Sequence, residues 1–239
     1  PKINQDEFYR FCTAVRPYVK LNTSPFLPTK TILIDLKPPV DMIFNRFSEA
    51  KRRAVRKAEK NGVLVRESQN ISDLIQIKNK SAGFLGFITT HGASELWSVF
   101  SPKNATILLA YTSNASADLS SPPRIKVRGK LQRGSRILSW IPGQARNDNK
   151  IIAGVLLIFY NNSAYYWIAG ATREGKKLSA PTILIYEALK NSKKRNMKIF
   201  DFVGVFDDRM PKENRAWKGF TKFKEGFGGN ELYYPISTL

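Results

Sequence analysis

The apolar run IIAGVLLIFY at residues 151–160 constrains the fold more than any other feature of this 239-residue chain. A helix that spans a bilayer needs about 20 apolar residues, so a run of this length predicts a buried β-strand instead. Asn161, Asn162 and Ser163 follow as a tight turn, and AYYWIAG at 164–170 then predicts the returning strand of a β-hairpin. Such an apolar hairpin has to be covered by further strands and helices.

Strands and helices alternate along the rest of the chain. Further strands are predicted over 29–36, 63–68, 106–111 and 198–205, and helices over 5–20, 41–60, 71–78, 93–100 and 180–196. Ser179 is placed to cap the last of these helices, and Pro181 suits its first turn. The pattern predicts a mixed α/β sheet with helices on both faces.

Positive charge dominates the composition and bears on the partners. The chain has 39 Lys and Arg against 19 Asp and Glu, a formal net charge of +20. Nucleic acid is the leading partner for such an excess, and an anionic membrane face or lipid carrier is the second. A general solubility adaptation explains the same charge without a partner. We see no secretion motif and expect a cytoplasmic protein, with peripheral contact at the inner membrane face as an option.

The single Cys and single His restrict the chemistry. Cys12 cannot form a disulfide within the chain, and a zinc site built from His and Cys lacks ligands. A catalytic triad would have to use His91, which lies beside a Gly without a nucleophile motif, so a surface loop is favoured. We therefore favour neither a His/Cys zinc site nor a catalytic triad.

Residues 112–150 interrupt the pattern. This segment has no sustained period of two or 3.6 and is rich in Ser, Pro, Arg and Asn. Without it, the strands at 106–111 and 151–160 would form an ordinary hairpin. We interpret it as an insertion at a hairpin tip, where the entropic cost grows only logarithmically with length. A basic RNA-binding loop is the alternative.

From Thr31 onward the order of motifs resembles the FemABX family of peptidoglycan bridge-forming aminoacyltransferases. The motifs are TILIDL (31–36), AKRRAVRKAEKNGVLV (50–65), TILLAY (106–111), the run at 151–160, the long segment 165–205 and WKGFTKFKEGFGG (217–229). The resemblance implies a GNAT-like mixed sheet flanked by helices, with residues 29–239 as one acyltransferase domain. Residues 1–28 resemble the last helix of a first GNAT-like domain, so we expect a remnant left by N-terminal truncation.

The resemblance also implies a reaction. Family members move an amino acid from aminoacyl-tRNA, which serves as co-substrate, to the stem peptide of a peptidoglycan precursor. That precursor is a muropeptide that is either lipid-linked or nucleotide-linked, and we expect the enzyme to be a monomer. The family's catalytic Phe-Lys pair matches Phe223 and Lys224. The Lys ammonium would stabilise the oxyanion or hold the tRNA 3′ end by its phosphate, and the Phe would pack on a terminal base or wall the site. An exposed Lys beside a core Phe is the alternative.

Other candidate residues follow from the sequence. Asp201 lies in a predicted buried strand, where it could act as a general base or hold a structural partner. Gly204 would permit a bulge or the close approach of substrate at the end of that strand. A basic stripe on the helix at 41–60 suits tRNA or a pyrophosphate, and a solvated helix face is the alternative. Its members are Arg52, Arg53, Arg56 and Lys57, and basic residues at 176–177 and 193–195 extend the argument.

Two other functions stay open. An acyl-CoA-dependent GNAT would hold the CoA pyrophosphate on the backbone amides of a Q/R-x-x-G-x-G/A loop. The equivalent stretch, ATREGKKLSAP at 171–181, has Arg173 and Gly175 but the wrong spacing and no second Gly. The remaining alternative is a catalytically inactive RNA- or envelope-binding module, left after truncation and insertion.

Overall fold

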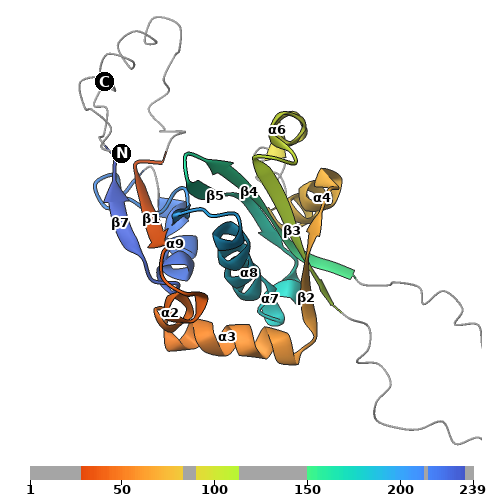
Figure 1. Cartoon of the computed structure of the whole chain (residues 1–239), viewed down its shortest axis with the longest axis horizontal. Coiled ribbons are helices and arrows are strands. Elements are labelled where there is room, and N and C mark those ends of the chain that lie inside the picture. The colour runs from red at the N-terminus through yellow and green to blue at the C-terminus, as the bar shows by residue number, and fades with distance from the viewer. Residues whose placement is uncertain (1–27, 83–89, 113–149, 213–214, 235–239) are drawn as a thin grey trace, which may run out of the picture.

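The structure, a computed structural model, describes residues 28–82, 90–112, 150–212 and 215–234. Nearly all of the predicted remnant at 1–28 and the interior of the predicted insertion lie outside these described residues. The described residues form one seven-stranded sheet with helices on both faces (Figure 1). The predicted mixed α/β class is therefore confirmed.

The sheet has the order β2-β3-β4-β5-β6-β1-β7, and the β5–β6 pair is parallel while the other recorded pairs are antiparallel. The strands are β1 (Lys30–Asp35), β2 (Val63–Ser68), β3 (Ala105–Thr112), β4 (Lys150–Tyr160), β5 (Ser163–Ala171), β6 (Ile199–Asp201) and β7 (Asn230–Tyr233). The helices are α2 (Val40–Asn45), α3 (Glu49–Lys60), α4 (Ile71–Ala82), α6 (Ala93–Phe100), α7 (Arg173–Lys177), α8 (Ala180–Lys194) and α9 (Lys218–Glu225), with a 3-10 turn, η2 (Arg215–Trp217), before α9.

The central hairpin forms as predicted from β4 and β5. Asn161 and Asn162 have φ values of 46° and 60°, the left-handed conformation that a two-residue hairpin turn requires. On the other side of β4, Thr112 of β3 pairs with Lys150. The strands on either side of residues 113–149 are thus antiparallel neighbours, as the insertion interpretation expects, and the origin of that segment stays a prediction.

Helices cover the two faces of the sheet. On the face that α8 and α3 cover, Leu184 of α8 joins Val155 and Leu157 of β4 in one buried cluster (Figure 1). On the opposite face, Leu74 of α4 packs with Leu156 of the same strand. Because β4 alternates its side chains between two covered faces, it has to be apolar throughout, which explains the run that dominates the sequence.

The single helix predicted over 41–60 is wrong, because the structure has two helices there. α2 ends at Asn45, and the side chain of Ser48 caps the start of α3. Nη1 of Arg52 donates to the carbonyls of Asn45 and Phe47 at 2.8 and 3.0 Å, which holds the break between the helices. The apolar period continues through both helices, so the pattern alone could not show the break.

Two further details of the sequence analysis are wrong. Ser179 adopts a φ of 61° and makes no side-chain cap hydrogen bond, so it turns the chain into α8 without capping it. The strand predicted over 198–205 ends at Asp201, because Val203 and Gly204 have φ values of 61° and 149° and leave the regular strand. Residues 202–205 are apolar, and Phe202 and Val205 pack in the core outside a strand, so hydrophobicity gave no sign of this end.

Gly175 of α7 has no room for a side chain, and this leads to a stability prediction. A Cβ at this position would lie 2.3 Å from the carbonyl oxygen of Ile152 in β4. Gly175→Ala is expected to push α7 from the sheet and to lower the free energy of unfolding by about 1–3 kcal/mol, measured by chemical denaturation. The matched control is Gly219→Ala in α9, where a Cβ meets no atom within 4 Å. It should be neutral or stabilising by up to ~1 kcal/mol, and equal stabilities of both variants would contradict the prediction.

Candidate active site

The strand β6 is shorter than its neighbour β5, and the candidate site lies where their pairing ends. They pair only from Ser163–Ile199 to Tyr165–Asp201. Beyond this point β6 ends, while β5 continues through residues 166–171 without a strand on that side among the described residues. Unpaired backbone N–H and C=O groups of a strand can bind an extended ligand. We call this place the β5–β6 fork.

Lys224 of α9 lies at the fork. It is buried, with 8% of its surface exposed. Its Nζ donates to the carbonyls of Phe202 at 2.8 Å and Gly204 at 2.7 Å, the residues that follow β6. An ammonium carries three N–H groups, so one is left for a further acceptor. Burial lowers the pKa of Lys224 to about 7, and the charge of Asp201 opposes this shift.

Aromatic rings surround the ammonium of Lys224. The ring centres of Phe220, Tyr166 and Phe202 lie 4.8, 5.8 and 6.0 Å from Nζ. Burial raises the pKa of Tyr166, so its hydroxyl stays protonated near neutral pH. Apolar surroundings lower the local dielectric, which strengthens the attraction between the ammonium and a negative charge that develops beside it.

Asp201 is buried beside the fork and is held by local contacts. Its carboxylate accepts hydrogen bonds from the hydroxyl of Thr31 and, at 2.7 Å, from the amide of Val203. Burial raises the pKa of Asp201, and the hydrogen bond from Thr31 lowers it again in part. Both contacts fix the chain where it leaves β6, which favours the structural role over the general base.

Gly204 is approached closely by the protein itself. A Cβ there would lie 2.9 Å from the ring of Trp217 in η2, so an indole packs closely on Gly204. The predicted approach of a substrate at Gly204 stays a prediction. The neighbouring Val203 has a φ of 61°, which is unusual for a β-branched residue. Backbone in sparsely populated conformations concentrates at functional sites. The unusual backbone conformation at Val203 lies between the Phe202 and Gly204 carbonyls, which both accept hydrogen bonds from Lys224.

Phe223 lies next to Lys224 in sequence but makes different contacts. Its ring packs on Phe227 with centroids 5.3 Å apart, and Nζ of Lys51 lies 3.6 Å from its centre. Burial lowers the pKa of Lys51 to about 8. Consecutive residues of a helix do not face each other, so the two members of the Phe-Lys pair serve different surroundings. The sequence analysis did not select Lys51, because helical periodicity does not show which distant rings meet a helix.

The four predicted basic residues of α3 do not act as one group. Arg52 binds backbone carbonyls at the α2–α3 break, as described above. Arg53 pairs with Glu49 at 3.4 Å, and both side chains are largely exposed, so the pair contributes little. Arg56 and Lys57 are exposed and keep their predicted role as candidates for contact with a polyanion.

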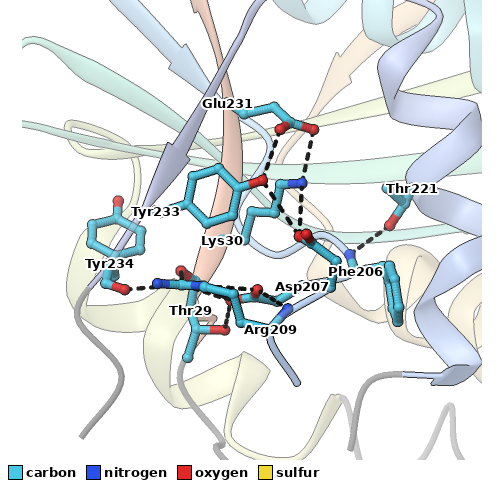
Figure 2. Close-up of polar contacts among 10 residues, drawn as sticks. Thr29, Lys30, Phe206, Asp207, Arg209, Thr221, Glu231, Tyr233 and Tyr234 are labelled. Carbon is cyan, nitrogen blue, oxygen red and sulfur yellow. Dashed lines mark hydrogen bonds and ion pairs between the residues drawn. The ribbon is translucent and has the colours of Figure 1, made fainter. Parts of the chain in front are cut away.

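A polar cluster that the sequence analysis missed ties the chain after β6 to the β1–β7 edge (Figure 2). Asp207 has no exposed surface and accepts hydrogen bonds from the hydroxyl of Thr29 at 2.6 Å and from Arg209 at 2.7 Å. Arg209 also donates to the carbonyls of Thr29 and Tyr234 at 3.0 and 3.1 Å. Its hydrogen bonds to Asp207 are the main cause that lowers the pKa of that carboxyl to about 2.

A second part of the same cluster lies along the paired edge strands. Nζ of Lys30 in β1 forms an ion pair of 2.9 Å with Glu231 in β7, and the ring of Tyr233 lies 4.7 Å from that Nζ (Figure 2). The whole cluster holds the segment that carries the Phe202 and Gly204 carbonyls. It therefore positions the acceptors of Lys224 without touching Lys224 itself.

The stretch at 171–181 does not offer a ring of free amides. Backbone N–H groups of this stretch already donate hydrogen bonds to acceptors within it, namely those of Gly175, Lys176, Leu178 and Ser179. A CoA pyrophosphate needs such amides turned outward at a helix N-terminus. This weighs against the acyl-CoA alternative.

Three further observations concern the described part of the chain. His91 is exposed in a turn, as predicted. Within the described residues, no three or more His, Cys, Asp and Glu side chains gather so that they could hold a metal ion. In the same part of the chain, none of the helices has the length and apolar character needed to cross a membrane.

The sheet and its covering helices define a GNAT-like fold, as predicted, and comparisons with known proteins agree. A model of the FemAB family matches residues 134–232, a range that begins inside the predicted insertion. The crystal structure of FemX matches with a TM-score of 0.64 and 16% identity, over 98% of this chain and 69% of that one. The C-terminal domain (DUF2156) of a putative lysylphosphatidylglycerol synthetase from Agrobacterium fabrum matches with a TM-score of 0.51 and 13% identity, over 95% and 70% of the two chains. A search of curated proteins found no match.

The family match and the FemX-like fold both support the FemABX resemblance that the sequence motifs predicted. At the level of the family, this supports a transferase of the peptidoglycan bridge-forming kind. The roles of individual residues at the fork stay predictions.

Proposed function

We propose that this chain transfers an amino acid from aminoacyl-tRNA to an amine on the stem peptide of a peptidoglycan precursor. The observation that carries the proposal is the buried ammonium of Lys224, fixed at the β5–β6 fork by two carbonyls with one N–H left over. A cation held in this way is suited to a substrate oxygen that becomes negative during the reaction.

The reaction needs an oxyanion site more than a strong base. The amine nitrogen attacks the ester carbonyl carbon, and the carbonyl oxygen takes up the negative charge. The carbon–oxygen bond to the tRNA ribose then breaks, while the attacking nitrogen loses a proton and the ribose oxygen gains one. Lys224 would donate its remaining N–H to the oxyanion, and the unpaired backbone of β5 would align the aminoacyl group. No step requires a metal or a bound organic cofactor.

The partners follow from this reaction. The exposed Arg56 and Lys57 would contact tRNA phosphates. Both substrates occur in the cytoplasm, so we propose that the protein works there. We also propose that it acts as a monomer. Peripheral contact with the inner membrane face would follow if the acceptor is lipid-linked.

A single-turnover assay tests this function. The full chain is mixed with tRNA that carries a radiolabelled amino acid and with either a lipid-linked or a nucleotide-linked muropeptide. Label is expected to appear in one of the two muropeptides, which also identifies the acceptor. Transfer from acetyl-CoA without transfer from charged tRNA would replace the proposal with the acyl-CoA alternative. Binding of tRNA without any transfer would leave an inactive binding module.

A further inference from the structure

Asp201 lies at the β5–β6 fork with only one of its two carboxylate oxygens bound. Only 5% of its surface is exposed. Its Oδ1 accepts hydrogen bonds from the hydroxyl of Thr31 and the amide of Val203, while no donor among the described residues bonds to Oδ2. Oδ2 is not among the buried atoms that lack a partner in this part of the chain, so it reaches the molecular surface. A nearly buried carboxylate therefore presents one free oxygen at the end of β6.

The free oxygen belongs to the last residue of the β5–β6 pairing and has Lys224 as its charged neighbour. Asp201 lies opposite Tyr165, and β6 ends there. Burial raises the pKa of Asp201, and the positive charge of Lys224 is one of the influences that lower it again. No ion pair joins these two side chains in the described part of the chain. Two opposite charges thus lie near each other at the fork without direct contact.

Two tyrosines complete the surroundings of Asp201. Burial and, to a smaller extent, the negative charges of Asp201 and Tyr165 raise the pKa of Tyr234 to about 12. Burial is also the main cause that raises the pKa of Tyr165, and the charge of Asp201 adds to it. Both hydroxyls therefore stay protonated near neutral pH. A carboxylate among tyrosine rings is a favourable place for a ligand cation, because both the carboxylate and aromatic faces attract positive charge.

The charges of an aminoacyl ester match this pair of residues. Its α-nitrogen is an ammonium, and the carbonyl oxygen that becomes negative during transfer is bonded to the next carbon but one. Lys224 donates to that oxygen in the proposed reaction, so the α-ammonium has to lie close to Lys224 as well. Asp201 is the neighbour of opposite charge, and its free Oδ2 can accept a hydrogen bond from the ammonium.

The attacking amine of the acceptor is the other primary ammonium of the reaction, and it fits Asp201 less well. It has to lose a proton before it attacks, whereas an ion pair with a carboxylate raises the pKa of an amine and keeps it protonated. The α-ammonium of the donor keeps its charge throughout the transfer. A contact between this group and Asp201 therefore does not oppose the reaction.

We propose that Asp201 is a specificity-determining residue of the fork, whose Oδ2 binds the α-ammonium of the amino acid on the donor. Thr31 and Val203 hold the other oxygen and so fix the direction of the free one. This inference rests on the proposed transfer function and deepens it, because it states which group of the donor the protein recognises. The fork selects aminoacyl groups with a free α-amine over N-acylated ones and over simple acyl groups such as acetyl.

A binding measurement with the full chain tests this recognition without turnover. The probe is an RNA hairpin whose 3′ terminus carries glycine through an amide in place of the ester, so that it does not react. The comparison is the same hairpin with the glycine α-nitrogen acetylated. The wild-type protein is expected to bind the free amine about 10–100-fold more tightly, the effect of one charged hydrogen bond. The net charge of +20 would favour the acetylated probe, so it cannot produce this preference.

Asp201→Asn should remove the preference by weakening the free-amine probe alone. Asparagine keeps an acceptor for Thr31 and Val203 and replaces Oδ2 with an N–H donor, which repels an ammonium. Asp35→Asn is the matched control, since Asp35 is an exposed carboxylate of the neighbouring strand β1 and should affect neither probe. In single-turnover transfer, Asp201→Asn is expected to slow the free-amine donor by a similar factor and to leave an N-acetylated donor unchanged.

Two results would overturn the inference. One is that the wild-type protein binds both probes equally or binds neither. The other is a preference that persists in Asp201→Asn protein whose thermal unfolding shows that it is folded, as a purely structural Asp201 or a contact with the acceptor amine would give. If the variant does not fold, the wild-type ratio still decides. A protein that prefers the free amine but transfers nothing would lose the proposed reaction and keep the ammonium site, so the two failures are distinguishable.

Discussion

Replacing Lys224 with methionine is expected to lower kcat for aminoacyl transfer by about 10²–10³-fold, the usual effect of removing one oxyanion donor. Methionine keeps most of the volume and removes all N–H donors. Affinity for charged tRNA should change little, because the contact forms fully only as charge develops on the substrate oxygen. Single-turnover transfer, with tRNA binding measured in parallel, separates the two quantities.

The control for this variant comes from the same helix. Lys222 is exposed on α9, so Lys222→Met removes an equal charge and should leave transfer unchanged. Lys224→Met also leaves the carbonyls of Phe202 and Gly204 without their donor, and its folding has to be verified by thermal unfolding. A folded Lys224→Met protein with wild-type kcat would remove Lys224 from the mechanism.

The pH dependence of transfer gives a second readout of Lys224. Because burial lowers its pKa to about 7, the charged form is lost as pH rises through that value. Transfer is therefore expected to decline on the alkaline side of 7 at saturating substrate. Lys224→Arg, which keeps its charge at all these pH values, should not show this decline. A wild-type profile that rises steadily to pH 9 would show that the ammonium form is not required.

Arg209→Ala is expected to lower the free energy of unfolding by about 3 kcal/mol, since it leaves a buried carboxylate without its cation. The carboxylate of Asp207 would keep the hydroxyl of Thr29 and lose all of its hydrogen bonds from the guanidinium. The carbonyls of Thr29 and Tyr234 would also lose a donor. Chemical denaturation at neutral pH measures the loss.

Protonation of Asp207 sets the direction of the pH effect on this stability difference. Its folded pKa of about 2 lies below the ordinary value of 3.8, so the Arg209 contact stabilises the fold fully above pH 4. This stabilisation is lost as pH falls from about 4 through 2, and the difference between wild type and Arg209→Ala should narrow there. Arg173→Ala, which removes an exposed arginine, is the matched control and should have little effect at any pH. A constant difference between pH 7 and 3 would contradict the assignment.

Local patterns in the sequence predicted much of the fold. The apolar run of β4 and the turn at Asn161–Asn162 are encoded by adjacent residues, and both formed as expected. The resemblance pointed to Lys224, which the structure places at the β5–β6 fork. The early end of β6 could not be predicted, because Val203 and Gly204 continue an apolar segment while the backbone turns away.

Contacts between distant residues were beyond the reach of the sequence patterns. The hydrogen bond from Thr29 to Asp207 joins residues 178 positions apart. The bond from Asn191 to Glu67 spans 124 positions. Hydrophobic periodicity reports only on neighbours along one helix or strand, so it could not predict either of these two hydrogen bonds. Each becomes visible only when the sheet brings its strands together.

The pairing of Thr112 with Lys150 has a practical consequence. The end of β3 and the start of β4 lie one strand spacing apart at this point, roughly 5 Å. Any polypeptide that joins the two strands therefore has to bridge only this short distance. A two-residue linker or a reporter domain with neighbouring termini could be attached here without changing the register of β3 and β4. This position is therefore suitable for inserting a domain into the protein and for shortening the chain.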